Sequence, residues 1–396
     1  MKKTWVSIPD VLFFQEGPGV RNTQYTVDGV KLLNVANLVD GKIDLSTSDR
    51  YISEKEAYGK YKHFLCDAGD FVIASSGIKV EYVDKKMGFV DESMLPLCMN
   101  TSTIRFKVLD EKQLRIRYFM YYLKSEHFKQ QLFKQITGSA QLNYGPSHLK
   151  KMIMPLIDLN DQDEIVSYMD KVQNIIEKRQ QELYRLDDLI KARFVEMFGD
   201  PVSNSYGLPE ATLPELGEFG RGISKHRPRN DPKLLGGDYP LIQTGDVANA
   251  GLYITSYNST YSEFGLKQSK MWEKGTLCIT IAANIAKTAI LTFDACFPDS
   301  VVGFTSNEKT NNIFIHYWFL FFQAILESQA PESAQKNINL KILSELRAIV
   351  PEKEKQDEFV DFIHQVDKSK VVYMYILKTR KYLMYNGEYR EKVNCI

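Results

Sequence analysis

An apolar seam occurs twice in the chain, at a constant offset of 194 residues. Steps of four and three residues from Ile165 to Met197 reach apolar side chains at eight of ten positions, and the same steps from Phe359 to Met384 do so at six of eight. This spacing is typical of the contact seam of a coiled coil. Acidic residues precede both seams, which suits the amino terminus of a helix. The sequence therefore predicts two long and equivalent helices.

Short matching blocks precede the two helices in the same order, with insertions of different length between them. The pairs are 32–35 with 241–244, 69–73 with 275–279, 118–123 with 317–322, and 141–143 with 335–337. One such match could arise by chance, but the shared order indicates a tandem duplication. Runs rich in β-forming residues, at 71–75 and 276–281, predict strands in both copies.

The duplication predicts an α/β (α+β) fold with two globular domains in tandem, each followed by a long helix. We expect a first domain at 1–155, a helix at 156–200, a second domain at 201–350, and a helix and tail at 351–396. Gly199 and Pro201 would end the first helix, because glycine suits a helix carboxyl cap and proline cannot continue the helix.

The formal net charge of the chain is zero, which counts against nucleic-acid binding, since a basic surface is its usual sign. The sum hides an uneven distribution, however. Residues 1–155 carry a net charge of +5 and residues 156–200 carry −5. An acidic helix thus masks a modestly basic first domain.

The sequence contains no segment that resembles a membrane span or a secretory signal. The most apolar run, 313–322, has only ten residues and contains His316, so it is expected to form a buried aromatic helix. The amino terminus reaches Pro9 and Asp10 without an apolar stretch. Five scattered cysteines, none in a C-x-x-C pair, favour neither disulfides nor zinc. We expect a protein of the reducing cytoplasm.

No catalytic constellation is recognisable. The phosphate loop, the G-x-S-x-G elbow and the H-E-x-x-H helix are absent. The acidic run around Glu352 and Glu354 opens a predicted helix and is expected to be a solvated face. No metal site and no resident cofactor are predicted.

The polar segment 221–230 is the leading candidate for a binding loop. It carries four cations and no acid. Arginine can donate two hydrogen bonds to guanine, asparagine can pair with adenine, and lysine or serine can hold a phosphate. A solvated basic loop is the rival interpretation. The candidate DNA-binding residues here are Ser224, Lys225, His226, Arg227, Arg229 and Asn230.

Matched polar positions elsewhere complete the candidate set. Asn34 in the first copy holds the place of Gln243 and Thr244 in the second, and a turn capped by its own side chains is the rival interpretation. The segments 75–79 and 281–287 form a further matched pair, whose small residues would let the backbone approach a partner closely; a tight turn is the alternative. The remaining candidates are Ser75, Ser76 and Lys79 with Asn284 and Lys287, and the loop residues Arg21, Asn22 and Gln24.

Four segments make the chain similar to the specificity (S) subunits of type I restriction-modification enzymes. Residues 193–200 resemble the terminus of that family's central helix, and 138–143 resemble the motif that precedes it. Residues 224–231 and 239–246 resemble a variant of the second target-recognition domain. The second helix departs from the pattern, because Lys370 and Arg380 occupy seam positions and its end lacks Phe-Gly-Asp.

The resemblance implies two target-recognition domains, each reading one half of a split double-stranded DNA target, and helices that pack as an antiparallel coiled coil. It further implies two methyltransferase subunits that hold S-adenosylmethionine, and a restriction subunit that can join them. The helix from Ile165 to Met197 spans 33 residues, about 50 Å at 1.5 Å per residue, which exceeds one DNA turn. The chain itself would be non-catalytic.

Two other functions are alternatives to this interpretation. A self-contained DNA-modifying enzyme would need a methyltransferase or nuclease motif, and none is present. A coiled-coil scaffold or receptor-type protein fits the helices and the neutral charge. The target bases are not predictable, because base choice depends on loop conformation.

Overall fold

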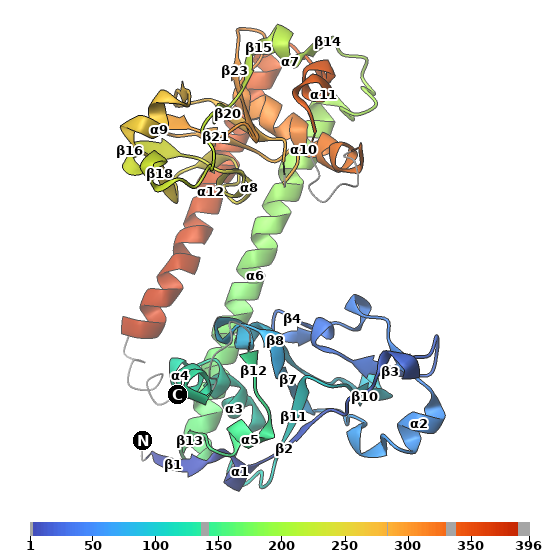
Figure 1. The fold of residues 1–396 in the computed structure, drawn as a ribbon. Helices are drawn as coiled ribbons and strands as arrows, with labels where there is room; N and C mark the ends of the chain where they lie inside the picture. Colours follow the sequence, from blue (N-terminus) through green and yellow to red (C-terminus); the bar gives the residue numbers. More distant parts are fainter. Residues whose placement is uncertain (1–2, 136–141, 283, 330–337, 387–396) are drawn as a thin grey trace. The chain divides into compact units, whose positions relative to one another are not determined.

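The computed structural model describes residues 3–135, 142–282, 284–329 and 338–386, and it divides into two compact units (Figure 1). Unit 1 comprises Met1–Lys178 with Ile376–Ile396, and unit 2 comprises Arg179–Tyr375. The division falls inside the long helix α6 (Leu159–Phe198), which contributes residues to both units. The domain boundaries at residues 155, 200 and 350 stay a prediction.

Unit 1 is built on a four-stranded antiparallel sheet of order β2-β11-β7-β9. A second sheet of order β10-β3-β6 contains the parallel pair β3 and β10, and an antiparallel pair joins the unit's first and last strands, β1 and β13. The strands are β1 (Thr4–Ser7), β2 (Leu12–Glu16), β3 (Val30–Leu33), β6 (Tyr51–Ile52), β7 (Phe71–Ala74), β9 (Met87–Phe89), β10 (Leu97–Met99), β11 (Thr103–Val108) and β13 (Ile153–Leu156).

Unit 2 repeats this arrangement. Its main sheet has the order β15-β23-β20-β21-β17, a parallel contact joins β16 and β22, and an antiparallel pair joins the first and last strands, β14 and β24. The strands are β14 (Glu210–Thr212), β15 (Gly217–Arg221), β16 (Leu235–Leu241), β17 (Tyr253–Ile254), β18 (Ser259–Tyr261), β19 (Met271–Trp272), β20 (Leu277–Thr280), β21 (Thr288–Leu291), β22 (Ala295–Cys296), β23 (Val301–Ser306) and β24 (Arg347–Ile349).

Equivalent backbone hydrogen bonds confirm the tandem duplication. The N–H of Tyr144 donates to the carbonyl of Ser75 over 2.9 Å, and the N–H of Ile338 donates to that of Ile281 over 3.0 Å. The two donors lie 194 residues apart, the offset of the seams. The predicted strands at 71–75 and 276–281 correspond to β7 and β20. Of the matched pair 141–143 and 335–337, residue 141 and residues 335–337 lie outside the described residues.

A short helix α3 (Ile116–Leu123) and the longer α10 (Asn312–Gln329) cover the equivalent sheets. The aromatic run 313–322 therefore forms a buried helix, as predicted, and Phe314, Trp318 and Phe319 have no exposed surface. Because a large apolar side chain gains about 1.5–3 kcal/mol on burial, these rings contribute strongly to the core. Within the described residues, no helix is both long and apolar enough to cross a membrane.

A buried glutamine lies at the same position near the start of both long helices, α6 and α12 (Lys353–Asn386). The Gln162 amide donates to the carbonyls of Gln113 and Ile157, each over 2.8 Å. The Gln356 amide donates to those of Lys309 (3.0 Å) and Pro351 (2.8 Å). Each amide group therefore supplies hydrogen bonds to two backbone carbonyls that would otherwise lack a donor. The pair thus fixes each helix to its own unit in the same way.

The predicted seam is confirmed along α6, where all ten seam positions are buried or half-buried. In unit 2 the partner is α12: Arg193 pairs with Glu358 at 2.9 Å, and Asp187 pairs with Lys370 at 2.6 Å. The order of the partners reverses along α12, so the two helices are antiparallel. Asp187 also explains how Lys370 fits a seam position, because it supplies the opposite charge. Side chains of α12 after Lys370 lie outside the described part of the structure.

His316 is a buried histidine in the core of unit 2. It lies on α10 at 6% exposure, and its Nδ1 is 2.9 Å from the Thr288 hydroxyl oxygen. Burial, reinforced by the positive charge of Lys370, lowers its pKa to about 4. The imidazole is therefore neutral in the folded protein at neutral pH.

We expect the free energy of unfolding of unit 2 to fall as the pH drops from about 6.5 to about 4. In that window the unfolded chain protonates His316 while the folded chain, with its pKa near 4, does not, so protons favour unfolding. The folded state should lose about 2 kcal/mol between pH 7 and pH 5. Denaturant unfolding followed by tryptophan fluorescence would measure this. His316→Gln, which cannot titrate, should show a loss smaller by that amount, and equal losses in both proteins would contradict the assignment.

Candidate nucleic-acid interface

The candidate binding loops of each unit meet at one edge of its main sheet. In unit 2, β15 and β20 both run antiparallel to β23, so their carboxyl ends lie beside the amino end of β23. In unit 1, β2 and β7 run antiparallel to β11 in the same way. We call these places the loop edges. They comprise residues 17–29, 34–37, 75–86 and 100–102 in unit 1, and 222–231, 243–246, 281–282, 284–287 and 297–300 in unit 2.

An aspartate organises the basic segment of unit 2. The carboxylate of Asp299, in the loop before β23, pairs with the guanidinium groups of both Arg227 and Arg229, and its backbone carbonyl accepts from Arg221. Arg227 also donates to the carbonyl of Ser224 over 2.6 Å. Both arginine side chains are about half exposed. The segment is thus a held loop with two exposed arginines, rather than a freely solvated one.

Further bonds hold the backbone of this loop. The side-chain oxygen of Gln268 accepts from the N–H groups of Lys225 (2.7 Å) and His226 (3.0 Å). The His226 ring contacts Asp231 at 2.8 Å and packs edge-on to Phe264. The N–H of Lys233 and the His226 ring lower the pKa of Asp231, which keeps this carboxylate ionised. Lys225 and Asn230 remain exposed on the outer side of the loop.

The other candidates of unit 2 lie in adjoining turns. Gln243 is exposed, and its backbone N–H donates to the Asp246 carboxylate over 2.8 Å at the start of α8 (Thr244–Ala248). The turn is thus capped by its own side chain, as the rival interpretation had it. Asn284 is exposed, whereas the Lys287 ammonium donates to Gln323 over 3.1 Å.

In unit 1, the loop equivalent to the basic segment exposes Arg21 and Asn22. Gln24 is engaged within the unit, because its amide donates to Glu56 (2.8 Å) and to the Tyr61 hydroxyl (3.0 Å). This loop therefore presents one cation, compared with the held arginine pair of unit 2.

Three candidates are buried and hydrogen-bonded inside the protein. Asn34 accepts from the Asn100 amide over 2.8 Å and donates to the carbonyl of Leu32. The Ser75 hydroxyl donates to Glu16 over 3.2 Å, and Ser224 is 7% exposed. In this conformation Asn34, Ser75 and Ser224 support the loops from beneath. Ser76 is half-buried, and Lys79 is exposed.

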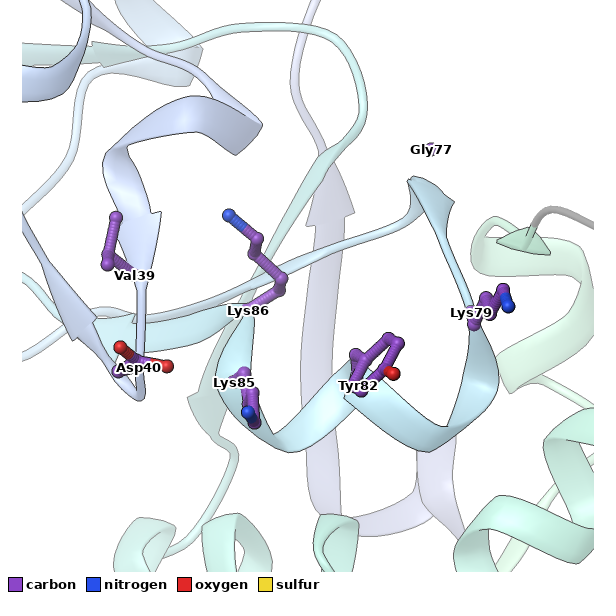
Figure 2. A pocket seen from close by; sticks show the side chains of 7 residues that line it. All are labelled: Val39, Asp40, Gly77, Lys79, Tyr82, Lys85 and Lys86. Atoms are coloured by element: carbon purple, nitrogen blue, oxygen red, sulfur yellow. The ribbon is translucent and has the colours of Figure 1, made fainter. Parts of the chain in front are cut away.

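A pocket of about 430 Å³ opens beside Lys79 in unit 1. Figure 2 shows Tyr82, on the short 3₁₀ helix η5 (Val80–Lys85), between Lys85 and Lys79, with Asp40 across from the helix. Asp40 belongs to a tight turn between β4 (Leu38–Val39) and β5 (Lys42–Ile43). The full lining is Val39, Asp40, Gly77, Lys79, Tyr82, Lys85 and Lys86.

Sequence reasoning missed several residues of these edges. Asp299 lies 70 residues after Arg229, and no spacing rule connects them. Gln268 and Tyr82 carry no motif. Lys85 and Lys86, by contrast, form an adjacent basic pair in a segment that differs in length between the two copies, and that signal was available. Among the described residues, no group of three or more His, Cys, Asp or Glu side chains could hold a metal ion.

Comparison with solved structures supports the fold. The S subunit of the type I restriction-modification system from M. genitalium aligns over 99% of this chain and 95% of its own, with a TM-score of 0.51 and 14% identity. A chain from a structural study of complex assembly and conformational transition of the type I R-M system aligns over 99% and 96%, with a TM-score of 0.54 and 14% identity.

Two curated relatives come from Methanocaldococcus jannaschii. The type I restriction enzyme MjaVIII specificity subunit is 26% identical over 186 residues, which is 46% of this chain but only 42% of that subunit. The putative type I restriction enzyme MjaX specificity subunit is 20% identical over 352 residues, 86% of this chain and 80% of that subunit.

The family model of the type I restriction modification DNA specificity domain matches twice, at residues 29–185 and 210–372. The two matches together cover well over half of the chain, and each contains most of one loop edge and the start of one long helix. The chain therefore belongs to the family of type I restriction-modification specificity subunits and carries two copies of the DNA specificity domain.

Proposed function

We propose that this chain is the non-catalytic subunit that gives a type I restriction-modification complex its DNA sequence specificity, with each loop edge reading one half of a bipartite, asymmetric target. The observation that carries the proposal is the repetition of one loop edge on two copies of one fold, with different exposed residues on each. Because the two folds are equivalent, they would hold the two loop edges in equivalent positions. Because the loops differ, each loop edge would recognise a different DNA sequence.

The residues proposed to contact DNA are those that the loop edges expose. In the second copy, Arg227 and Arg229 have the fork geometry that guanine accepts in the major groove, and Asp299 holds both in place. Lys225 and Asn230 are exposed on the same loop, and Gln243 and Asn284 are exposed on the adjoining loops. In the first copy the exposed candidates are Arg21, Asn22 and Lys79. The buried Asn34, Ser75 and Ser224 would shape these loops without touching DNA.

The long helices are proposed to set the spacing of the two half-sites and to dock two methyltransferase subunits. α6 has 40 residues, about 60 Å of helix, more than one turn of DNA at roughly 34 Å. The methyltransferase subunits would hold S-adenosylmethionine and methylate adenine, and a restriction subunit would join them for cleavage. Such an assembly acts on cellular DNA, so we place the chain in the cytoplasm.

Mapping of methylated adenines tests this function. The full chain is co-expressed with its methyltransferase subunits in a host that lacks adenine methylation, and the genome is sequenced for modified bases. We expect a bipartite, asymmetric motif. Replacement of residues 201–350 by the matching segment of another family member should change only one half of that motif. A single unsplit motif, or a motif unchanged by the replacement, would refute the proposal.

A further inference from the structure

The pocket of unit 1 has the composition of a phosphate-binding site. Three lysines and one aspartate line it, which leaves a net charge of +2. Lys79 and Lys85 are exposed and Lys86 is half-buried. None of the three has a carboxylate within ion-pair distance among the described residues. The Lys85 ammonium lies 5.6 Å from the centroid of the Tyr82 ring. Lysines that line one pocket without a carboxylate partner attract a polyanion such as a phosphate backbone.

The walls of the pocket are held in place. The N–H of Gly41 donates to the carbonyl of Lys85 over 3.0 Å, which ties the β4–β5 turn to η5. Lys129, on α4 (Glu126–Gln135), pairs with Asp84 at 3.5 Å. This carboxylate is therefore neutralised by Lys129 and not by the lysines of the pocket. Gly77 has a φ of +74° and open space around its Cβ position, so the backbone there can approach a ligand closely.

The segment that forms the pocket is larger in the first copy than in the second. Between β7 and β9 lie twelve residues, 75–86, whereas seven residues, 281–287, lie between β20 and β21. The longer segment carries Lys79, Lys85 and Lys86, and the shorter one carries Lys287 alone. The second copy instead places its cations on the loop after β15. The two copies therefore concentrate positive charge on different loops of the same edge.

We propose that the 75–86 segment is a clamp for the phosphate backbone of duplex DNA, specific to the first recognition domain. Lys79, Lys85 and Lys86 bind phosphate oxygens, and the half-exposed Tyr82 packs against the adjoining sugar. Lysine is a compact point charge that suits a phosphate, whereas arginine suits a base edge. The clamp would thus add affinity without sequence preference, and it rests on the proposed function of the chain.

Salt dependence of DNA binding tests the clamp. Each phosphate neutralised by a lysine contributes about −0.9 to the slope of log affinity against log salt concentration, whatever the DNA sequence. The full-length chain is titrated with a mixed-sequence 40-base-pair duplex between about 50 and 200 mM salt. We expect Lys85→Ala/Lys86→Ala to reduce the magnitude of the slope by about 1.8. The ratio of the affinity at 50 mM salt to that at 200 mM salt should then be about twelvefold smaller than in the wild type.

Two matched variants separate a clamp from a general charge effect. Lys150→Ala/Lys151→Ala removes the same charge from exposed positions of the same unit that lie off the loop edge, and its slope should equal that of the wild type. Lys85→Arg/Lys86→Arg keeps the charge and should keep the slope. Equal slopes for the wild type and Lys85→Ala/Lys86→Ala would overturn the clamp, and so would an equal reduction in the Lys150/Lys151 variant. An absent bipartite methylation motif would instead overturn the proposed function.

Discussion

Simultaneous replacement of Arg227 and Arg229 by alanine is expected to reduce methylation of the DNA target by roughly a hundredfold, because a bidentate arginine–guanine contact is worth about 1–3 kcal/mol. Both guanidinium groups are about half exposed and both are held by Asp299. Their loss should leave the fold intact, since exposed ion pairs contribute about 0–1 kcal/mol. The full complex, assayed by methylation sequencing, supplies the measurement.

The loss should be confined to one half of the motif. Residual methylation by the Arg227/Arg229 variant should occur at sites where the half read by the second domain is relaxed, while the other half is retained. The matched control is Lys341→Ala/Arg347→Ala, which removes the same charge from α11 (Leu340–Glu345) and β24, away from the loop edge. Loss of equal size in the control, or relaxation of both halves, would show that these arginines do not read bases.

Phe194→Ala is expected to lower the free energy of unfolding of unit 2 by about 3–5 kcal/mol, because a fully buried phenylalanine leaves a cavity. Phe194 has no exposed surface, and its ring lies 5.3 Å from that of Phe314 and 5.3 Å from that of Phe359. These rings come from α6, α10 and α12. One substitution therefore weakens the contact among all three helices.

Denaturant unfolding followed by tryptophan fluorescence would measure the effect, since Trp272 and Trp318 both lie in unit 2. Val195→Ala is the control, because this neighbour on α6 is 39% exposed and should change stability by less than about 0.5 kcal/mol. If both variants lost equal stability, the aromatic cluster would not be what joins the end of α6 to this unit.

The aromatic cluster gives a physical reason for the motif at 193–200. Phe194 and Phe198 are buried in unit 2, and Arg193 pairs with Glu358. Gly199, which follows the last residue of α6, has a φ of +75°, a left-handed conformation that suits glycine after a helix. The helix end was predictable from sequence because caps are local. That it belongs to the core of the second unit was not.

The repeated scaffold was predictable from the sequence alone. A seam repeats every three or four residues because of the geometry of a single helix, so its period is visible without any partner. The 194-residue offset is likewise visible in the sequence. It relates Gln162 to Gln356, whose side chains make equivalent buried hydrogen bonds. These features depend on residues close together in the chain or on exact repetition.

Contacts between distant segments determine which polar residues of the loops face outward. Asn34 looked equivalent to Gln243, yet Asn100 holds it in the interior while Gln243 is exposed. Asp299 meets Arg229 only because β15 and β23 are paired, and the lysine pocket closes only where the β4–β5 turn meets η5. Such contacts join residues that are distant in sequence, and loop conformation sets them, so no local period or spacing records them.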